Sequence, residues 1–315
     1  MKVAVTGAAG FIGSHLVPSL LFAGHDVTAI MESGTVLQSG YVHQVIADVT
    51  TGEGLPESIS DVDAVVHLAA RNHVLKETEK DPLSAYRRVN VEGTRNVIQA
   101  AVKAGARWFI HFSSVKATEE GGEAVFDENS PCRPATPYGI SKLESEEVVR
   151  AEAGGTGMDV VIFRLPMVYG PGNKGNLPRM IRWAERGLPF PLVQPDNLRS
   201  MVYVGNVVAA VKAVLETHPT SGAVQKTYIV KDDADCSTRM TYSSICRELG
   251  RRPRFLPVPT TLGRIAGAIS EDFRKVTSSF RVSSAKIREE IGFVPPVSGE
   301  EGIARTVQWY KRSAR

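Results

Sequence analysis

The sequence is poor in cysteine, in long apolar runs and in excess charge of either sign. Its three cysteines, Cys132, Cys236 and Cys246, form neither a disulfide framework nor a closely spaced metal set. We therefore expect no metal site and a reducing compartment. No apolar stretch reaches the roughly 18 residues that a membrane span needs, and glycines interrupt the apolar start of the chain. These absences predict a cytoplasmic protein with no membrane partner.

The charge balance argues against a nucleic-acid partner. The chain has 37 Lys and Arg against 34 Asp and Glu, a net charge of +3. Basic residues are scattered, apart from a small cluster at Arg251, Arg252 and Arg254 and a basic tail. A groove for nucleic acid would need a continuous basic stripe. One or two arginines that bind an anionic small molecule fit the sequence better.

The chain is long enough for two lobes. It has 315 residues, of which 43% are hydrophobic and 23% charged, as in ordinary globular proteins. Single cores stop growing at roughly 250 to 300 residues. Several prolines after residue 165 break the chain into loops and short helices. We expect a first lobe of residues 1–165 with a return segment at about 203–216, and a second lobe of residues 166–202 and 217–315.

Short runs rich in β-branched residues alternate with helical patterns in the first half of the chain. Most of these runs are apolar on both faces, which is typical of parallel strands covered by helices. The expected strands are residues 2–6, 26–30, 41–47, 64–68, 108–113 and 159–164. The sequence thus predicts an α/β protein with a Rossmann-like, doubly wound parallel sheet and a smaller C-terminal lobe.

A glycine-rich segment directly follows the first expected strand and opens a helix at residues 14–23. Gly7, Gly10 and Gly13 have the spacing GxxGxxG, with Phe11 and Ile12 between the last two. At such a turn the glycines allow a sharp bend and a close approach of the backbone to a pyrophosphate, which binds at the helix N-terminus. This position in the fold predicts a dinucleotide site.

The ends of the next two strands bear on which dinucleotide binds. A carboxylate at the end of the second strand commonly accepts the ribose hydroxyls of NAD, whereas a basic residue suits NADP. The chain has Met31 and then Glu32 there, which favours NAD and leaves NADP open. Asp48 and Val49, after the third strand, are expected to frame the adenine, although Asp48 could equally be a turn residue.

Tyr138 and Lys142 stand four residues apart in a segment that begins with Pro137, a favourable first residue of a helix. Both side chains therefore share one helix face. Ser113 and Ser114 end the fifth strand, at the carboxyl edge where such sheets bind ligands. Lys142 and a positive nicotinamide would lower the pKa of the Tyr138 phenol toward neutrality, so that it exchanges a proton with a sugar hydroxyl.

Several motifs together resemble the extended short-chain dehydrogenase/reductases, the nucleotide-sugar epimerase and dehydratase family, along essentially the whole chain. The motifs are TGAAGFIGSHL from residue 6, HLAA from 67, NVEGT from 90, FSS from 112, YGISK from 138 and RLPMVYGPG from 164. They occur in the order and spacing of that family. The resemblance implies a nucleotide-sugar substrate and a homodimer that pairs the helices at residues 82–103 and 137–153.

The resemblance also implies roles for individual residues. Tyr138, Lys142 and Ser114 would be the catalytic set, with Ser113 as a rival to Ser114. The residues implied to border the cofactor are Leu68, Ala69, Ala70 and Pro166, together with Tyr138 and Lys142. The residues implied to bind the nucleotide sugar are Asn176, Leu177 and, for the diphosphate, Arg199.

Two asparagines stand at motif positions without a settled role. Asn90 is either functional or a helix-packing residue. Asn206 stands where relatives usually carry Asp, and we expect this difference to affect local structure more than chemistry.

The residues after the strand-end serines bear on the reaction. Relatives that dehydrate the sugar carry an acidic pair there, because elimination needs a further acid and base. This chain has Val115 and Lys116. The sequence therefore favours a 4-epimerase of UDP-sugars that works through a 4-keto intermediate. A reductase of a UDP-4-keto-6-deoxy sugar and a non-catalytic dinucleotide sensor remain alternatives.

Overall fold

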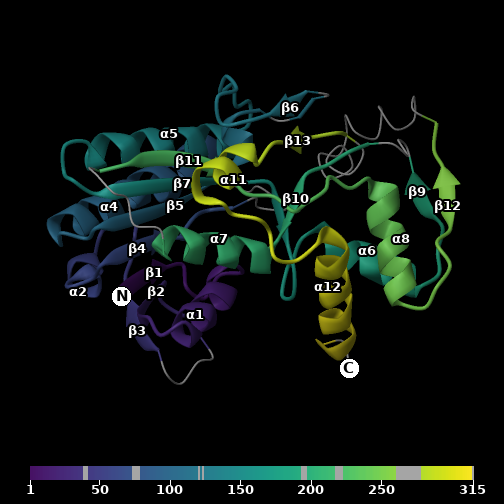
Figure 1. The fold of residues 1–315 in the computed structure, drawn as a ribbon, viewed down its shortest axis with the longest axis horizontal. Coiled ribbons are helices and arrows are strands. Elements are labelled where there is room, and N and C mark those ends of the chain that lie inside the picture. Colours follow the sequence, from purple (N-terminus) through teal and green to yellow (C-terminus); the bar gives the residue numbers. More distant parts are fainter. Residues whose placement is uncertain are drawn as a thin grey trace.

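A sheet of seven parallel strands forms the centre of the computed structural model (Figure 1). Its spatial order is β3-β2-β1-β4-β5-β7-β11. The strands are β1 Lys2–Thr6, β2 Asp26–Met31, β3 His43–Ile46, β4 Ala64–His67, β5 Trp108–Ser114, β7 Asp159–Leu165 and β11 Gln225–Ile229. The chain order reverses at β1, between β2 and β4. Doubly wound proteins bind ligands beside such a reversal, at the carboxyl edge of the strands.

The structure describes residues 1–37, 42–72, 79–119, 121–122, 124–192, 197–216, 223–259 and 278–313. In these ranges no helix is both long and apolar enough to cross a membrane.

Helices cover both faces of the sheet because its strands are apolar on both sides. Val3 and Val5 pack in the core of one face, and Ala4 between them packs in the core of the other. The helices on the first face are α1 Gly13–Phe22, α7 Val204–Glu216 and α11 Ala285–Ile291. The helices on the second are α2 Leu55–Ile59, α4 Gly93–Lys103 and α5 Pro137–Ala153, with α3 Pro82–Arg87 packed on α5.

A second core lies beside the sheet, to its right in Figure 1. It is built from the helices α6 Asn176–Glu185, α8 Thr238–Glu248 and α12 Gly299–Ser313 and the strand pairs β8 Met167–Tyr169 with β10 Met201–Tyr203 and β9 Phe190–Leu192 with β12 Phe255–Pro257. Aromatic rings fill this core, where Phe190 stacks on Tyr242 with centroids 4.6 Å apart. A smaller strand pair, β6 Val125–Phe126 with β13 Arg281–Val282, packs against Val115, which follows β5.

The six strands expected from apolar runs are present, and the α/β fold is confirmed. The third is His43–Ile46, shorter than expected, and Tyr41 lies outside the described residues. The helices expected at residues 14–23 and 137–153 are α1 and α5.

The packing differs in one respect from the expected division into lobes. Residues 217–315 were assigned to the second lobe, yet β11 pairs with β7 in the central sheet and Ile287 of α11 packs in the sheet core. Without β11, the long strand β7 would end the sheet with unpaired backbone groups. The sequence does not readily predict this strand, because three of the five residues of β11 are polar and the strand is only half buried.

Candidate active site

The glycine turn after β1 lies against the loop that follows β4. Gly7 has a φ of +67°, and a Cβ there would come within 2.7 Å of the Ala69 nitrogen and 2.9 Å of its Cα. Both conformation and space therefore require glycine. The Ala69 N–H donates to Thr6 Oγ1 at 3.3 Å, which fixes the two segments together. Leu68, Ala69 and Ala70 thus lie beside the glycine turn at the chain reversal.

The rest of the turn folds tightly onto the start of α1. A Cβ at Gly13 would lie 2.5 Å from the carbonyl oxygens of Gly7 and Ala8, and the Gly10 N–H donates to the Gly7 carbonyl at 2.9 Å. The N-cap residue Ile12 provides no side-chain acceptor for the first N–H groups of α1. The Ser14 and Leu16 N–H groups already donate to the carbonyls of Gly10 and Ile12, each at 2.9 Å. The N–H groups before Ser14 are therefore the ones placed to meet an anion, as the sequence predicts for a pyrophosphate.

The same segment touches the second lobe. Phe11 and Ile12 pack against the second core, and the His15 ring lies edge-on to Phe11 at 5.7 Å. His15 Nε2 is 2.8 Å from the Pro171 carbonyl oxygen, which follows β8. The glycine turn is therefore anchored in both lobes.

The other expected cofactor residues lie along the same strand ends. Glu32 is exposed just after β2. Asp48 is also exposed and accepts from Thr50 N and Oγ1, each at 2.7 Å, which lowers the pKa of its carboxyl. These bonds give Asp48 the role of a turn residue, whether or not it meets an adenine. Val49 is held by α4, where Asn96 Nδ2 donates to its carbonyl at 2.9 Å. Pro166 is buried after β7.

Helix α5 positions Tyr138 and Lys142. Thr136 caps it by accepting from the Gly139 N–H at 3.2 Å, and Pro137 begins it. Tyr138, in the first turn, is half buried, and its ring lies 5.9 Å from that of Tyr86. Lys142, one turn later, is only 3% exposed. Burial lowers the pKa of Lys142 to about 8, against an opposing effect from the charge of Glu146.

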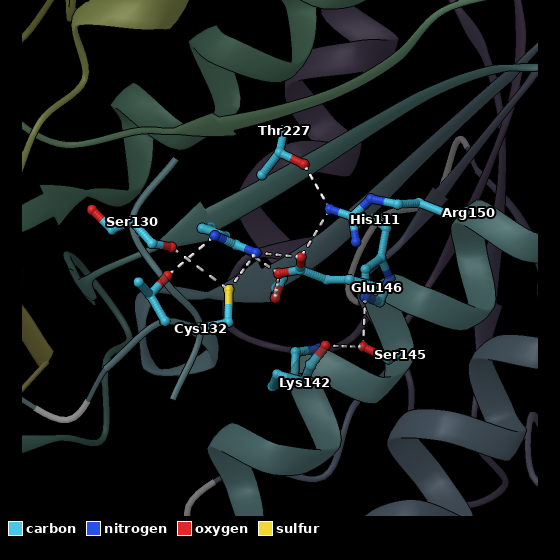
Figure 2. Close-up of polar contacts among 11 residues, drawn as sticks. His111, Ser130, Cys132, Lys142, Ser145, Glu146, Arg150 and Thr227 are labelled. Atoms are coloured by element: carbon cyan, nitrogen blue, oxygen red, sulfur yellow. Dashed lines mark hydrogen bonds and ion pairs between the residues drawn. The ribbon is translucent and has the colours of Figure 1, made fainter. Parts of the chain in front are cut away.

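The rings of His67 in β4 and His111 in β5 stack on each other beside α5, with ring centroids 5.6 Å apart. Ser145 Oγ donates to the Lys142 carbonyl at 2.7 Å and therefore accepts from His111 Nε2 at 2.9 Å, as Figure 2 shows. Thr94 Oγ1 likewise donates to Asn90 and accepts from His67 Nε2 at 3.0 Å. Each ring thus carries a proton on Nε2. Burial keeps both rings neutral, because it lowers the pKa of His67 to about 3 and that of His111 well below its usual range.

The two serines at the end of β5 have different partners. Ser113 Oγ donates to Glu146 Oε1 of α5 at 2.6 Å, a short bond to a buried carboxylate. Ser114 points to the other side of the strand, where its Oγ accepts from the Lys116 N–H at 3.2 Å and reaches the Leu165 carbonyl at 3.5 Å. The Ser113 hydroxyl is therefore held by Glu146. The longer contacts of Ser114 can be exchanged more easily for a hydrogen bond to a ligand.

Asn90 has a larger structural part than the sequence indicates. It lies in a π-helical turn, Arg88–Glu92, between α3 and α4. Its side chain accepts from Arg71 N at 2.8 Å and donates to Arg71 O at 3.1 Å and to Ser141 Oγ at 3.0 Å. Asn90 thus joins the loop after β4 to the helix of Tyr138. Turns of this kind are frequent at functional sites, but residue pattern alone does not predict the wider turn.

The expected sugar-binding residues belong to the second lobe. Asn176 is the half-buried first residue of α6, whereas the side chain of Leu177 is buried in the second core at 2% exposure. Arg199 Nη1 donates to the carbonyl and hydroxyl of Ser278 at 2.7 and 3.1 Å. Burial lowers the pKa of Arg199 to about 10. Within the described ranges, no carboxylate lies within 4.0 Å of its guanidinium.

Comparisons with known proteins agree with this arrangement. Residues 3–230 match the NAD dependent epimerase/dehydratase family. The UDP-glucose 4-epimerase of Vibrio cholerae is 31% identical over 314 residues, which cover 98% of this chain and 94% of that protein. The N-acetyl-alpha-D-glucosaminyl-diphospho-ditrans,octacis-undecaprenol 4-epimerase of Escherichia coli O157:H7 is 28% identical, with coverage of 98% and 95%. The solved structure of MoeE5 in complex with UDP-glucose and NAD is similar over 100% of both chains, with a TM-score of 0.82 and 28% identity.

Proposed function

Because the chain belongs to the NAD dependent epimerase/dehydratase family, we propose that it inverts C4 of a UDP-activated sugar with bound NAD. The observation that carries the proposal is the placement of Tyr138 and the buried Lys142 on successive turns of a capped helix. That helix packs on β5, whose end carries the two serines.

The glycine turn fits a dinucleotide because it follows β1 directly at the chain reversal and, without a Cβ at Gly7 to clash with the Ala69 backbone, lies close against the loop after β4. In the proposal, Gly7, Gly10, Phe11, Ile12 and Gly13 hold the pyrophosphate. Further cofactor contacts come from Glu32 at the ribose, Asp48 and Val49 at the adenine, and Leu68, Ala69, Ala70, Lys142 and Pro166 toward the nicotinamide. Bound NAD would supply the hydride acceptor and donor for C4 of the sugar.

Tyr138 takes the proton of the C4 hydroxyl and gives it back when the 4-keto sugar is reduced. The ammonium of Lys142 favours the phenolate form of Tyr138, since a nearby positive charge stabilises an anion. Ser114 donates a hydrogen bond to the reacting sugar oxygen, because its own contacts are long enough to exchange. Ser113 stays on Glu146.

Arg199 pairs with the diphosphate of the substrate in this proposal. In the part of the chain that the structure describes, this buried guanidinium is bonded only to neutral groups, so it retains donors and charge for phosphate oxygens. Asn176, at the start of α6, lies on the same lobe, and Leu177 shapes the site from within the core. The names of the Vibrio cholerae relative and of the MoeE5 complex support UDP-glucose as a first substrate to test.

Epimerisation is favoured over dehydration by the residues after Ser114. Val115 is 3% exposed and packs with Ile229 and Phe280, and Lys116 is basic. Neither position supplies the carboxyl groups that elimination of water requires. We also propose a homodimer through α4 and α5, which lie side by side on one face of the sheet. Size-exclusion chromatography with light scattering tests that assembly.

The experiment is conversion of UDP-glucose or UDP-N-acetylglucosamine by the purified protein, followed by NMR of the sugar. Tyr138→Phe should reduce turnover by at least about 100-fold and leave NAD binding within about twofold. Tyr310→Phe, on the remote helix α12, is the matched control and should keep full turnover. Turnover that survives Tyr138→Phe would contradict the mechanism. Consumption of NADPH with a 4-keto sugar and no epimerisation would indicate the reductase, and binding without either reaction the sensor.

A further inference from the structure

Glu146 is a completely buried carboxylate on α5, one turn after Lys142. Its exposure is 0%. Arg164, from β7, donates to both of its oxygens, with Nε to Oε1 and Nη2 to Oε2 each at 2.8 Å. Ser113 Oγ donates a third bond at 2.6 Å from the end of β5. Such paired, charge-assisted bonds fix both the position and the ionisation of a carboxylate.

Further bonds hold Arg164 and Glu146 in place. Arg164 Nη1 donates to Thr118 Oγ1 at 3.1 Å, and its Nη2 reaches Cys132 Sγ at 3.3 Å. Arg150, one turn after Glu146, donates from Nη2 to Glu146 Oε2 at 3.0 Å and to Thr227 Oγ1 of β11 at 2.9 Å. Figure 2 shows Glu146 between Arg150 and Cys132, with Lys142 on the preceding turn. The network joins α5 to three strands and to the loop before α5.

Among the described residues, the charge that acts on Lys142 is that of Glu146. His67 of β4 and His111 of β5 interact with Lys142 but are kept neutral by burial, which lowers the pKa of each ring. Tyr138 precedes it on α5. Burial opposes ionisation of Glu146, but the hydrogen bonds and charge of Arg164 outweigh burial and hold its pKa below the usual range. Glu146, one helical turn from Lys142 on α5, is therefore the anion whose charge opposes the effect of burial on that lysine.

We infer that Glu146 is a positioning residue of the reaction: its carboxylate, fixed by Arg164 and Ser113, keeps the Lys142 ammonium charged while Lys142 acts on Tyr138. The inference rests on the proposed function, because it concerns the same phenol and lysine. Tyr138, Lys142, Glu146 and Arg150 follow one another at intervals of four residues, so they form a row along one side of α5. Through Glu146 this row connects the reacting groups to β7 and β11.

The consequence is a defined pH dependence. Activity that needs a charged Lys142 declines as the pH rises through the pKa of Lys142, which lies at about 8. Glu146→Gln keeps the size of the side chain and removes the charge, so the alkaline decline of kcat should move down by roughly one pH unit. Arg150→Gln removes a cation that offsets Glu146 and should move the decline upward by a few tenths of a unit. Glu146→Asp keeps the charge and should stay near the wild-type midpoint despite lower turnover.

The experiment combines two readouts on the full chain. The first is the pH profile of kcat for the wild type and the three variants. The second needs no turnover: trace acetic anhydride labels the neutral amine of Lys142 at each pH, and mass spectrometry of its peptide gives the titration midpoint. A merely structural role predicts that Asp perturbs the protein more than the isosteric Gln, with unchanged midpoints. The charge role predicts a shifted midpoint for Gln and none for Asp.

The outcomes separate the two proposals. A Lys142 midpoint in Glu146→Gln that coincides with the wild type overturns the inference, whatever the activity. If Glu146→Gln fails to fold by circular dichroism, an unmoved midpoint in the half-exposed Arg150→Gln overturns it instead. Loss of turnover in Tyr138→Phe together with unmoved midpoints leaves the proposed function standing alone. Shifted midpoints together with full turnover in Tyr138→Phe would contradict the proposed function and support the electrostatic link only.

Discussion

Glu146 on α5 and Asp232 in the second lobe are both removed from water, with exposures of 0% and 2%. Glu146 has the Arg164 guanidinium on both oxygens. Asp232 has only neutral donors in the described ranges: Asn206 Nδ2 at 2.7 Å, the Tyr203 N–H at 2.8 Å and the Tyr169 hydroxyl at 2.7 Å. The Arg164 partnership holds the pKa of Glu146 below its usual range, whereas burial raises that of Asp232. A cation, more than the number of hydrogen bonds, decides the charge of a buried acid.

The hydrogen bonds of Tyr169 tie Asp232 into the second lobe. The phenolic hydroxyl has two acceptors in reach, Asp232 Oδ2 at 2.7 Å and the Gly299 carbonyl at 3.0 Å. Tyr169 thus joins Asp232 to the start of α12. The acid of the second lobe is held by neutral donors, whereas the acid of α5 is held by an ion pair.

The largest expected effect follows from removal of the cation at Glu146. Arg164→Met leaves a buried carboxylate without its main partner and should lower the free energy of unfolding by about 3–5 kcal/mol. Urea denaturation measures the loss. The double variant Arg164→Met with Glu146→Gln is the control and should recover much of the stability, because no unpaired charge remains. A loss below about 1 kcal/mol would show that Arg150 alone suffices.

The next effect follows from replacing a neutral donor of Asp232 with a second acid. Asn206→Asp sets a second carboxyl against Asp232 and removes the amide that donates to Asp232 and to the Val297 carbonyl at 2.7 Å. The variant should lose about 2–3 kcal/mol at pH 8, and less at pH 5 where one of the two acids keeps a proton. Exchange of both groups, as Asn206→Asp with Asp232→Asn, restores one amide and one acid. If the double variant is no more stable than Asn206→Asp, the loss of stability does not come from the missing amide.

A smaller effect tests whether the Ser113 hydroxyl or the Arg164 guanidinium holds the Glu146 carboxylate in place. Ser113→Ala removes one bond to the carboxylate and should cost about 1–2 kcal/mol in unfolding free energy. Turnover should stay within about threefold of the wild type, because Arg164 remains. Ser114→Ala is the matched comparison and should reduce turnover by about tenfold or more with little loss of stability. The reverse pattern in the two variants would make Ser113 the substrate contact.

The smallest effect is a difference between the two acids in how their contribution to the free energy of unfolding changes with pH. In the folded protein the pKa of Asp232 lies above the ordinary value of 3.8, so its contribution is complete below pH 3.8 and is lost as the pH rises through the folded pKa. The pKa of Glu146 lies below 4.5, so its contribution is present above pH 4.5 and is lost as the pH falls. Unfolding of Asp232→Asn and Glu146→Gln from about pH 3 to 8 should therefore show stability differences from wild type with opposite trends. Parallel trends would contradict the opposite directions of the two pKa shifts.

The two regions also differ in how far the sequence predicts them. The strands β1, β4, β5 and β7 are continuous apolar runs, and the glycine turn is recognisable because it directly follows β1. Tyr138 and Lys142 are recognisable because a helix repeats its faces every four residues. The pairing of Glu146 with Arg164 is not, since it depends on how α5 lies across β7. The same holds for Asn90, whose π-helical turn reflects tertiary contacts, and for β11, which is half polar and joins the sheet only as the neighbour of β7.

The row along α5 has a consequence for how the protein can change. In an α-helix each residue turns the chain by about 100°, so one inserted or deleted residue between positions 138 and 150 would swing every later side chain away from its partner. The loop before α5 has no such repeat to preserve. The length of the helix is therefore fixed, and natural variation in chain length should accumulate before Thr136 and after Ala153.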